Sequence, residues 1–192
     1  GERMLSCLRY VVKNTEIPPS NMLPTHINRS TRLLKDGMDY AKTLGGYVDL
    51  TTSSDPDYLE EDEVKASTGL KFLLEQGVPE HQITFSSDGQ GSMPIFDRDG
   101  NFLGLGVGKV TSLYREVRDA ILKEKVDITQ ALRTVTANPA ALLKLTRKGR
   151  IAVGCDADLV LVRQEDLQIH TVLAKGRRMV QNGASVRKGT FE

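Results

Sequence analysis

Two short segments of the sequence contain the side chains best suited to chemistry. His26 lies near the end of an apolar run at residues 22–27, and Asp88 ends a second apolar run at residues 83–88. A histidine nitrogen can bind a metal ion or transfer a proton, and a carboxylate can ligate a metal and accept a proton from a metal-bound water. Each also has an ordinary interpretation, because a lone histidine is usually structural and Ser-Ser-Asp-Gly is a good turn sequence. The residues alone leave both interpretations open.

Arg29 and a glycine pair stand beside these two residues. The guanidinium of Arg29 can bind a substrate carboxylate through two parallel hydrogen bonds, or it can form a surface salt bridge of little consequence. Gly89 and Gly91 follow Asp88 and would let a backbone approach a ligand closely. They belong to neither the Gly-x-Gly-x-x-Gly motif nor the P-loop, so a phosphate-binding fingerprint is not indicated.

The sequence offers few further metal ligands. A functional metal site typically needs three or more protein ligands. His81 and His170, the remaining histidines, are both predicted on the surface and form no His-x-His pair. Cys7 and Cys155 lie far apart, and we expect them to be buried reduced thiols, which favours an intracellular origin. The metal site suggested by His26 is therefore predicted to be incomplete.

Composition excludes several classes of protein. The 192 residues include 26 Lys and Arg against 25 Asp and Glu, a balance that argues against nucleic-acid binding. With 39% hydrophobic and 27% charged residues, the composition is typical of a soluble globular chain. No apolar run approaches the ~18 residues of a membrane helix. The chain begins with Gly1 and not with Met, which indicates either a processing scar or a piece of a longer chain.

Hydrophobic periodicity predicts alternating helices and strands. Helices are predicted over residues 4–13, 33–44, 64–76, 107–123, 129–135 and 140–145, and strands over residues 22–27, 47–52 and 83–88. This alternation predicts βα units around a parallel sheet. All three strands end in polar residues, and the C-terminal strand ends carry the chemistry of parallel α/β folds. We therefore expect His26 and Asp88 at the same edge of the sheet.

Two loops and a strand-rich C-terminal part complete the predicted pattern. An acidic stretch at 55–63 is predicted as a solvated loop leading into a helix, and 97–101 as a turn. From residue 149 the sequence becomes strand-rich, with strands predicted over 151–162 around a turn at 154–156. A hairpin is predicted over 172–180 with its bend at residues 175–176. We therefore divide the chain into an α/β part, 1–148, and a β segment, 149–192.

Three motifs resemble those of a known family. They are Leu23-Pro24-Thr25-His26-Ile27-Asn28-Arg29, then Phe85-Ser86-Ser87-Asp88-Gly89-Gln90-Gly91-Ser92, and finally the run at 149–160, Gly-Arg-Ile-Ala-Val-Gly-Cys-Asp-Ala-Asp-Leu-Val. The third resembles a general motif of the metal-dependent amidohydrolase superfamily. The first two resemble, more specifically, the isoaspartyl (β-aspartyl) dipeptidases within it.

The resemblance implies a fold and a set of roles. It implies the C-terminal half of a (β/α)8 TIM-type barrel, with the last three strands and their helices, followed by a small β-sandwich portion. Members bind two zinc ions bridged by a carboxylated lysine. By position, His26 is similar to a zinc-binding histidine, and Asp88 to an aspartate that binds zinc and acts as general base and acid. Arg29 and Ser92 are similar to residues that hold the carboxylate groups of the substrate.

The resemblance also implies an activity and its limits. The parent enzyme would hydrolyse β-aspartyl peptide bonds by attack of a metal-activated hydroxide. The His-x-His strand, the carboxylated lysine and the fifth-strand histidine have no counterpart in this chain, so the fragment alone is expected to be inactive. We expect a small β-aspartyl dipeptide as substrate, a cytoplasmic homo-oligomer, and neither nucleic acid nor membrane as partner. The alternatives are a catalytically dead, self-associating fragment, or another amidohydrolase that acts on N-acyl amino acids or cyclic amides.

Overall fold

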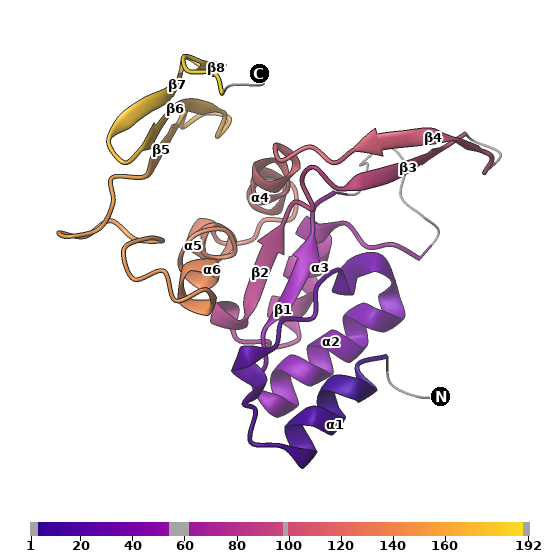
Figure 1. Cartoon of the computed structure of the whole chain (residues 1–192). Helices are drawn as coiled ribbons and strands as arrows, with labels where there is room; N and C mark the ends of the chain where they lie inside the picture. Colours follow the sequence, from indigo (N-terminus) through magenta and orange to yellow (C-terminus); the bar gives the residue numbers. More distant parts are fainter. Residues whose placement is uncertain (1–3, 54–61, 98–99, 190–192) are drawn as a thin grey trace.

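Two parallel strands occupy the centre of the fold (Figure 1). The structure is a computed structural model that describes residues 4–53, 62–97 and 100–189. Strand β1 (Val48–Thr51) pairs in parallel with β2 (Ile83–Ser86), so that the strands predicted over 47–52 and 83–88 are confirmed. All four residues of β1 are buried. Burial along a whole strand is typical of a parallel sheet covered by helices.

The prediction of a third strand over residues 22–27 is wrong. This segment is extended over residues 22–25, between the short 3-10 helices η1 (Pro19–Asn21) and η2 (Ile27–Arg29). It lies beside β1, because the Asp49 N–H donates a 3.0 Å hydrogen bond to the carbonyl of Pro24. Pro24 has no N–H to donate in return, and His26 turns the chain with a φ of 58°. A regular ladder therefore does not form.

Six helices surround the strands in the part of the chain that the structure describes. They are α1 (Ser6–Asn14), α2 (Thr31–Leu44), α3 (Ala66–Glu75), α4 (Ser112–Leu122), α5 (Ile128–Arg133) and α6 (Ala137–Leu142). Helix α2 begins after Ser30, whose side chain accepts a hydrogen bond from the Leu33 N–H, and it ends at Gly45 with a φ of 72°. Buried side chains of α2, α3 and α4 join those of β1 and β2 in one apolar core.

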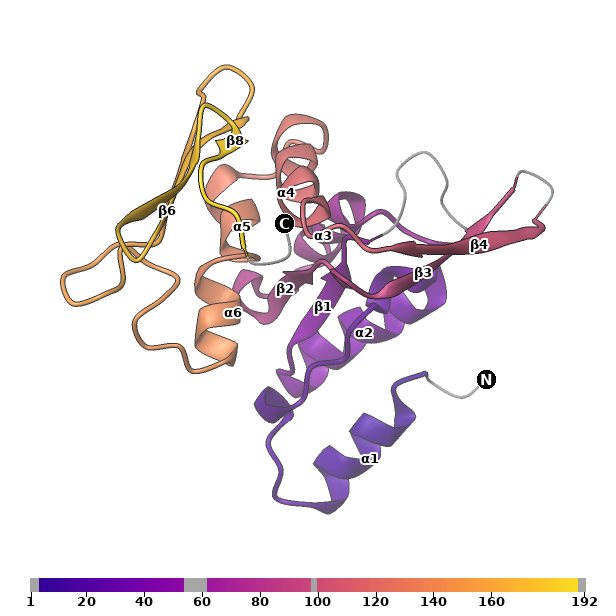
Figure 2. The ribbon, with the colours of Figure 1, turned by 45° about the horizontal axis from the view of Figure 1, so that its top comes forward.

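The helix predicted over 107–123 begins too early, because a projecting hairpin comes before it. Strands β3 (Ser92–Phe96) and β4 (Phe102–Val107) pair antiparallel and extend away from the body of the fold, as Figures 1 and 2 show. Helix α4 therefore starts only after them. The alternating glycines of β4 weaken any strand signal, which explains why the hairpin is not predicted. The predicted turn is present in its described part, where the Asp97 N–H bonds to the Asn101 carbonyl at 2.9 Å.

The C-terminal part of the chain forms a separate antiparallel sheet. Its strands are β5 (Leu159–Val162), β6 (Ile169–Ala174), β7 (Arg177–Gln181) and β8 (Ala184–Ser185), in that order across the sheet. The predicted bend is confirmed, since Lys175 and Gly176 have φ values of 48° and 75°, as a two-residue hairpin turn requires. Residues 151–158 form no strand and turn at 153–154, so the strand predicted from 151 begins only at Leu159.

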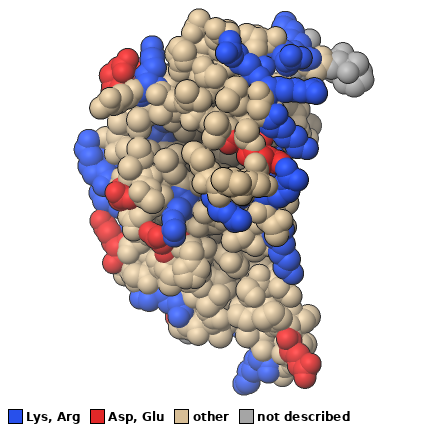
Figure 3. Space-filling model, turned by 90° about the vertical axis from the view of Figure 1, so that its left-hand side faces the viewer, with Lys and Arg blue, Asp and Glu red and all other residues tan. Residues whose placement is uncertain are grey.

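Helix α4 connects this sheet to the body. The Tyr114 hydroxyl donates to the Leu167 carbonyl at 2.9 Å, and Arg118 donates to the Asp166 carbonyl at 2.9 Å. Lys and Arg side chains gather on the upper part of the molecule in Figure 3, which carries this sheet.

Three further expectations concern the cysteines, membrane-spanning helices and the acidic loop. Cys7 is exposed and Cys155 is partly buried, so the prediction of buried thiols is wrong for Cys7. No helix among the described residues is long and apolar enough to cross a membrane. Residues 55–61 of the acidic loop predicted over 55–63 lie outside the described residues, as does Gly1.

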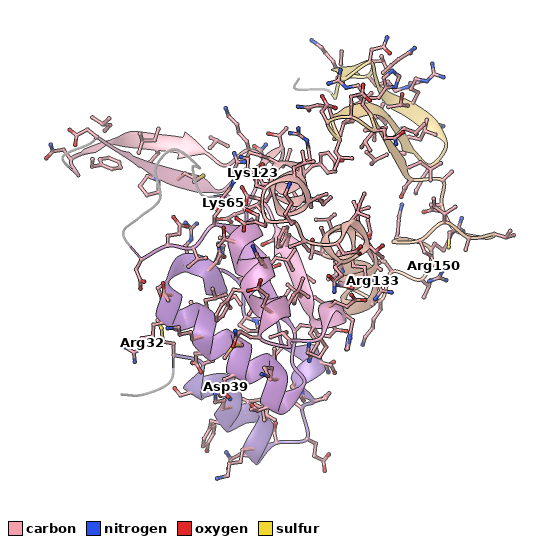
Figure 4. All side chains as sticks on the ribbon, turned by 180° about the vertical axis from the view of Figure 1, so that it is seen from behind. Arg32, Asp39, Lys65, Lys123, Arg133 and Arg150 are labelled. Atoms are coloured by element: carbon pink, nitrogen blue, oxygen red, sulfur yellow. The ribbon has the colours of Figure 1, made fainter. Side chains whose placement is uncertain are left out.

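A cluster of charges joins α3 to α4. The Lys65 ammonium forms an ion pair with Asp119, which also accepts a 3.0 Å hydrogen bond from Lys123; Figure 4 shows the two lysines close together. The buried Glu116 carboxylate accepts a 3.1 Å hydrogen bond from the Ser67 N–H, in the first turn of α3. This carboxylate satisfies the helix end, because Lys65 at the N-cap position makes no side-chain cap.

We expect Asp119→Asn to destabilise the protein in a pH-dependent way. Burial raises the pKa of Asp119, but hydrogen bonds and charges from Lys65 and Lys123 outweigh burial and hold the pKa below its ordinary value. The stabilisation is therefore present above the unfolded pKa of about 4 and is lost as the pH falls through the lowered folded value. Urea unfolding at pH 7 should show a loss of about 1–3 kcal/mol that shrinks in acid.

A matched control uses a more exposed ion pair. Glu80 bonds to Arg133 at 2.7 Å, and both side chains are more than a third exposed. Glu80→Gln should change the free energy of unfolding by less than about 1 kcal/mol. An equal loss in the two variants, or a loss in Asp119→Asn that does not change with pH, would contradict the role given to Asp119.

Candidate functional site

The candidate site lies at the C-terminal edge of β1 and β2. Because the two strands run parallel, both carboxyl ends reach the same edge. The chain stays paired just past β1, where the Thr52 N–H donates to the Ser86 carbonyl at 2.8 Å. The Thr52 hydroxyl lies 2.9 Å from that of Ser112, at the start of α4. This edge is therefore polar and hydrogen-bonded, as expected from the polar strand ends.

Asn28 connects the segment that carries His26 to this edge. Its side chain is fully buried, and its Nδ2 donates to the carbonyls of Thr51 at 3.0 Å and Val64 at 2.8 Å. The Thr51 N–H donates back to Oδ1 at 2.8 Å. The amide thus continues, two residues further along β1, the pairing that the Pro24 carbonyl makes with Asp49. A side chain here takes the place of a strand backbone.

His26 reaches the site in an unusual backbone conformation. Its φ of 58° is in the left-handed region, at the start of η2. Its Nδ1 is buried and has no hydrogen-bond partner among the described residues. A buried imidazole nitrogen without a partner is suited to a metal ion or a polar ligand atom.

Asp49 adds a carboxyl group that the sequence analysis did not single out. It is 2% exposed, and it accepts hydrogen bonds from the Thr84 hydroxyl at 2.7 Å and from the Ser86 hydroxyl. Burial raises its pKa to about 6, against the lowering effects of these bonds and of the nearby His26. A charged residue between Val48 and Leu50, inside a predicted buried strand, was the available signal.

Arg29 is held in place by two partners. Its Nη1 lies 2.6 Å from Oε1 of Glu63, and its Nη2 donates to the Ser53 hydroxyl at 3.0 Å. The Glu63 side chain is only 3% exposed, whereas that of Arg29 is 37% exposed. The prediction of a solvated acidic loop is therefore wrong for Glu63. Arg29 is both oriented and accessible, as recognition of a ligand carboxylate requires.

Asp88 and Ser92 flank the glycine loop beyond β2. Asp88 is exposed, has a φ of 49° and accepts a 3.1 Å hydrogen bond from the Gly91 N–H, so it lies in a turn. Ser92 is exposed at the first position of β3. Gly108 lies at the neck of the hairpin, where its strands leave the body of the fold. A Cβ at Gly108 would lie 2.6 Å from the Asp88 carbonyl oxygen. Glycine is required at that close approach.

The structure places the four predicted residues in two pairs, one following the extended segment 22–25 and one following β2. His26 and Arg29 are fixed by Asn28 at the end of β1, and Asp88 and Ser92 follow β2. His81 and His170 are exposed, as predicted. Within the described ranges, no group of three or more His, Cys, Asp or Glu side chains could hold a metal ion. A binuclear metal centre therefore does not fit these residues alone, although the unpartnered His26 nitrogen is suited to one ligand position.

Comparisons with known proteins agree on one family. The model of the Amidohydrolase family matches residues 23–179. The fold is similar to that of a β-aspartyl dipeptidase from Fervidobacterium islandicum AW-1, solved in complex with the β-Asp-Leu dipeptide, with a TM-score of 0.82 and 36% identity. That alignment covers 99% of this chain but 47% of the dipeptidase. A second structure of this dipeptidase gives 32% identity, a TM-score of 0.80 and coverages of 99% and 46%.

More distant structures share the fold alone. A D-hydantoinase from a Thermus species is 18% identical with a TM-score of 0.62, over 94% of this chain and 49% of that enzyme. The chain thus spans about half the length of the structures that it matches.

Proposed function

The chain belongs to the amidohydrolase family, and we propose that it is the C-terminal part of a zinc-dependent isoaspartyl dipeptidase. Such an enzyme hydrolyses β-aspartyl peptide bonds. The observation that carries this proposal is the similarity over 99% of the chain to a dipeptidase that binds β-Asp-Leu, with Arg29 held at the site edge. In this proposal β1, β2 and the extended segment 22–25 are the last three strands of a (β/α)8 barrel, and residues 149–192 belong to a β-sandwich.

His26 and Asp88 are proposed as two of the metal ligands, with the others contributed by polypeptide outside this chain. When bound, zinc would provide a hydroxide at neutral pH. The residues of this chain then have separate tasks. Asp88, in its exposed turn, accepts a proton from the nucleophile and returns it to the leaving amine. Arg29 and Ser92 hold the carboxylates of the dipeptide, and Glu63 keeps the Arg29 guanidinium oriented.

The orientation and exposure of Arg29 favour a dipeptide over a cyclic amide. A β-aspartyl dipeptide has two free carboxylates, which suit an exposed arginine fixed by a buried glutamate. A cyclic amide does not require such a partner. The D-hydantoinase likeness therefore supports a shared fold, and the proposed chemistry rests on the dipeptidase likeness.

We expect the 192-residue chain alone to be inactive, because two ligands cannot hold a binuclear centre. Atomic absorption should show less than one zinc per chain, and β-Asp-Leu hydrolysis should be at background. A longer protein that joins this chain to the remaining barrel strands should bind zinc and turn the dipeptide over. Stoichiometric zinc together with turnover by the 192-residue chain would contradict the prediction that its metal site is incomplete.

In the longer protein, Asp88→Asn should lower kcat by at least about 100-fold, because the amide neither binds zinc well nor accepts a proton. Circular dichroism should show an intact fold, since Asp88 is exposed. Asp127→Asn is the matched control, because Asp127 is an exposed N-cap of α5 and asparagine caps equally well. Unchanged activity in Asp88→Asn would end its assignment as acid and base.

Arg29→Met should mainly raise KM for β-Asp-Leu, by about 10- to 100-fold, since one charge-assisted contact is lost. Arg133→Met is a close control, because Arg133 pairs with Glu80 at 2.7 Å and is 42% exposed, against 37% for Arg29. Figure 4 shows Arg133 on α5, away from Lys65 and Lys123. Steady-state kinetics of the longer protein measure both variants. Equal KM values for the Arg29→Met and Arg133→Met variants would contradict the role of Arg29 in substrate binding.

A further inference from the structure

The two faces of the β1–β2 sheet differ in chemistry. One face joins the apolar core beneath the helices and consists of Val48, Leu50, Ile83 and Phe85. Because successive side chains of a strand alternate between faces, the other face consists of Asp49, Thr51, Thr84 and Ser86. In the proposed barrel this second face is the interior, which bulky apolar residues normally fill. Polar residues in their place need a specific reason.

Asp49 belongs to this polar face and is buried by the chain itself. It is 2% exposed, and its neighbours Thr51 and Thr84 are 0% and 1% exposed. The remaining polypeptide of a longer protein can only add to this burial. Oδ1 of Asp49 accepts the 2.7 Å hydrogen bond from the Thr84 hydroxyl, and Oδ2 accepts one from the Ser86 hydroxyl. The carboxylate therefore bridges β1 and β2.

The partners of the Asp49 side chain are hydroxyl groups and not cations. No Lys or Arg among the described residues forms an ion pair with this carboxylate. Burying a carboxylate without a cation costs stability, and an apolar residue of similar size often stabilises a fold more. Stability by itself therefore does not account for Asp49, which points to a positional role.

The contacts of Asp49 reach towards both metal ligands proposed in this chain. Its backbone N–H donates to the Pro24 carbonyl at 3.0 Å, two residues before His26. Its carboxylate binds the Ser86 hydroxyl, two residues before Asp88. The segment that leads to His26 and the strand that leads to Asp88 thus share one residue as their partner.

We propose that Asp49 is a positioning residue, which sets the separation of His26 and Asp88 so that both side chains can bind metal at one site. The backbone contact holds the extended segment 22–25 against β1, while the carboxylate holds the end of β2 in register with β1. His26 and Asp88 have these roles in the proposed dipeptidase, on which the inference rests. Asp49 acts through its neighbours and is not itself a ligand.

The zinc affinity of the longer protein tests this role without any need for turnover. Asp49→Ala should raise the dissociation constant for zinc at least about tenfold, the usual effect of losing a partner that orients metal ligands. Asp49→Asn should restore most of the affinity, because its carbonyl oxygen can accept from Thr84 and its amide can donate to the Ser86 hydroxyl oxygen. Competition with a chelator of known affinity measures the parent and both variants. Unchanged affinity in Asp49→Ala would overturn the proposal.

Asp36→Ala is the matched control. Asp36 is likewise a hydrogen-bonded carboxylate, which accepts from the Leu5 N–H at 2.7 Å and from Arg9 at 2.9 Å, but it joins α1 to α2. Both alanine variants should lose stability in urea, and only Asp49→Ala should lose zinc affinity. An equal loss of zinc affinity in both variants, or no recovery in Asp49→Asn, would contradict a positioning role.

Ser86→Ala keeps the test decisive where circular dichroism shows that Asp49→Ala does not fold. It removes the bond nearest Asp88 and leaves the bond to Thr84 in place, so zinc affinity should fall about 3- to 10-fold. Unchanged zinc affinity in folded Ser86→Ala would then overturn the proposal.

Hydrolysis of β-Asp-Leu is scored separately from zinc affinity. A parent that binds zinc but does not hydrolyse the dipeptide would contradict the proposed function, while loss of zinc affinity in Asp49→Ala would still support the role of Asp49. A parent that binds no zinc would overturn both.

Discussion

The candidate site depends on one buried amide. The side chain of Asn28 binds both the N–H and the C=O of Thr51 and also the carbonyl of Val64. A buried backbone group without a partner costs about 1–3 kcal/mol, and β1 has no further strand on this side among the described residues. The amide supplies the missing partners and fixes the backbone that carries His26 and Arg29. Loss of this contact would loosen the strand end and the site together.

Periodicity was enough to predict the elements whose patterns are purely local. β1 and β2 are short apolar runs between helices, and the turn at Lys175 and Gly176 has a strong two-residue signal. The extended segment 22–25 was predicted as a strand because its composition is apolar, but a strand also needs donors, which Pro24 lacks. The β3–β4 hairpin was missed because it buries little, so its sequence carries no alternation between apolar and polar residues.

The contacts that support the site were beyond prediction for a different reason. Glu63 and Glu116 are the two buried glutamates that matter most, and each is defined by a partner far away in the sequence. Glu63 orients Arg29, 34 residues earlier, while Glu116 satisfies the start of α3, 49 residues earlier. No spacing rule connects such residues, because only the tertiary fold brings them together. The chemistry of His26 and Asp88 was visible in residue type and strand position, whereas their support was not.

The hairpin neck has a consequence for how this region can vary. At Gly108, a single added carbon would meet the Asp88 carbonyl oxygen at 2.6 Å, so even alanine forces the backbone to move. Beyond the neck, Phe102, Leu103 and Leu105 are 60%, 65% and 69% exposed. Mutational tolerance should therefore change steeply within a few residues. The outer strands can therefore accept substitutions that the neck at Gly108, packed against the turn of Asp88, cannot.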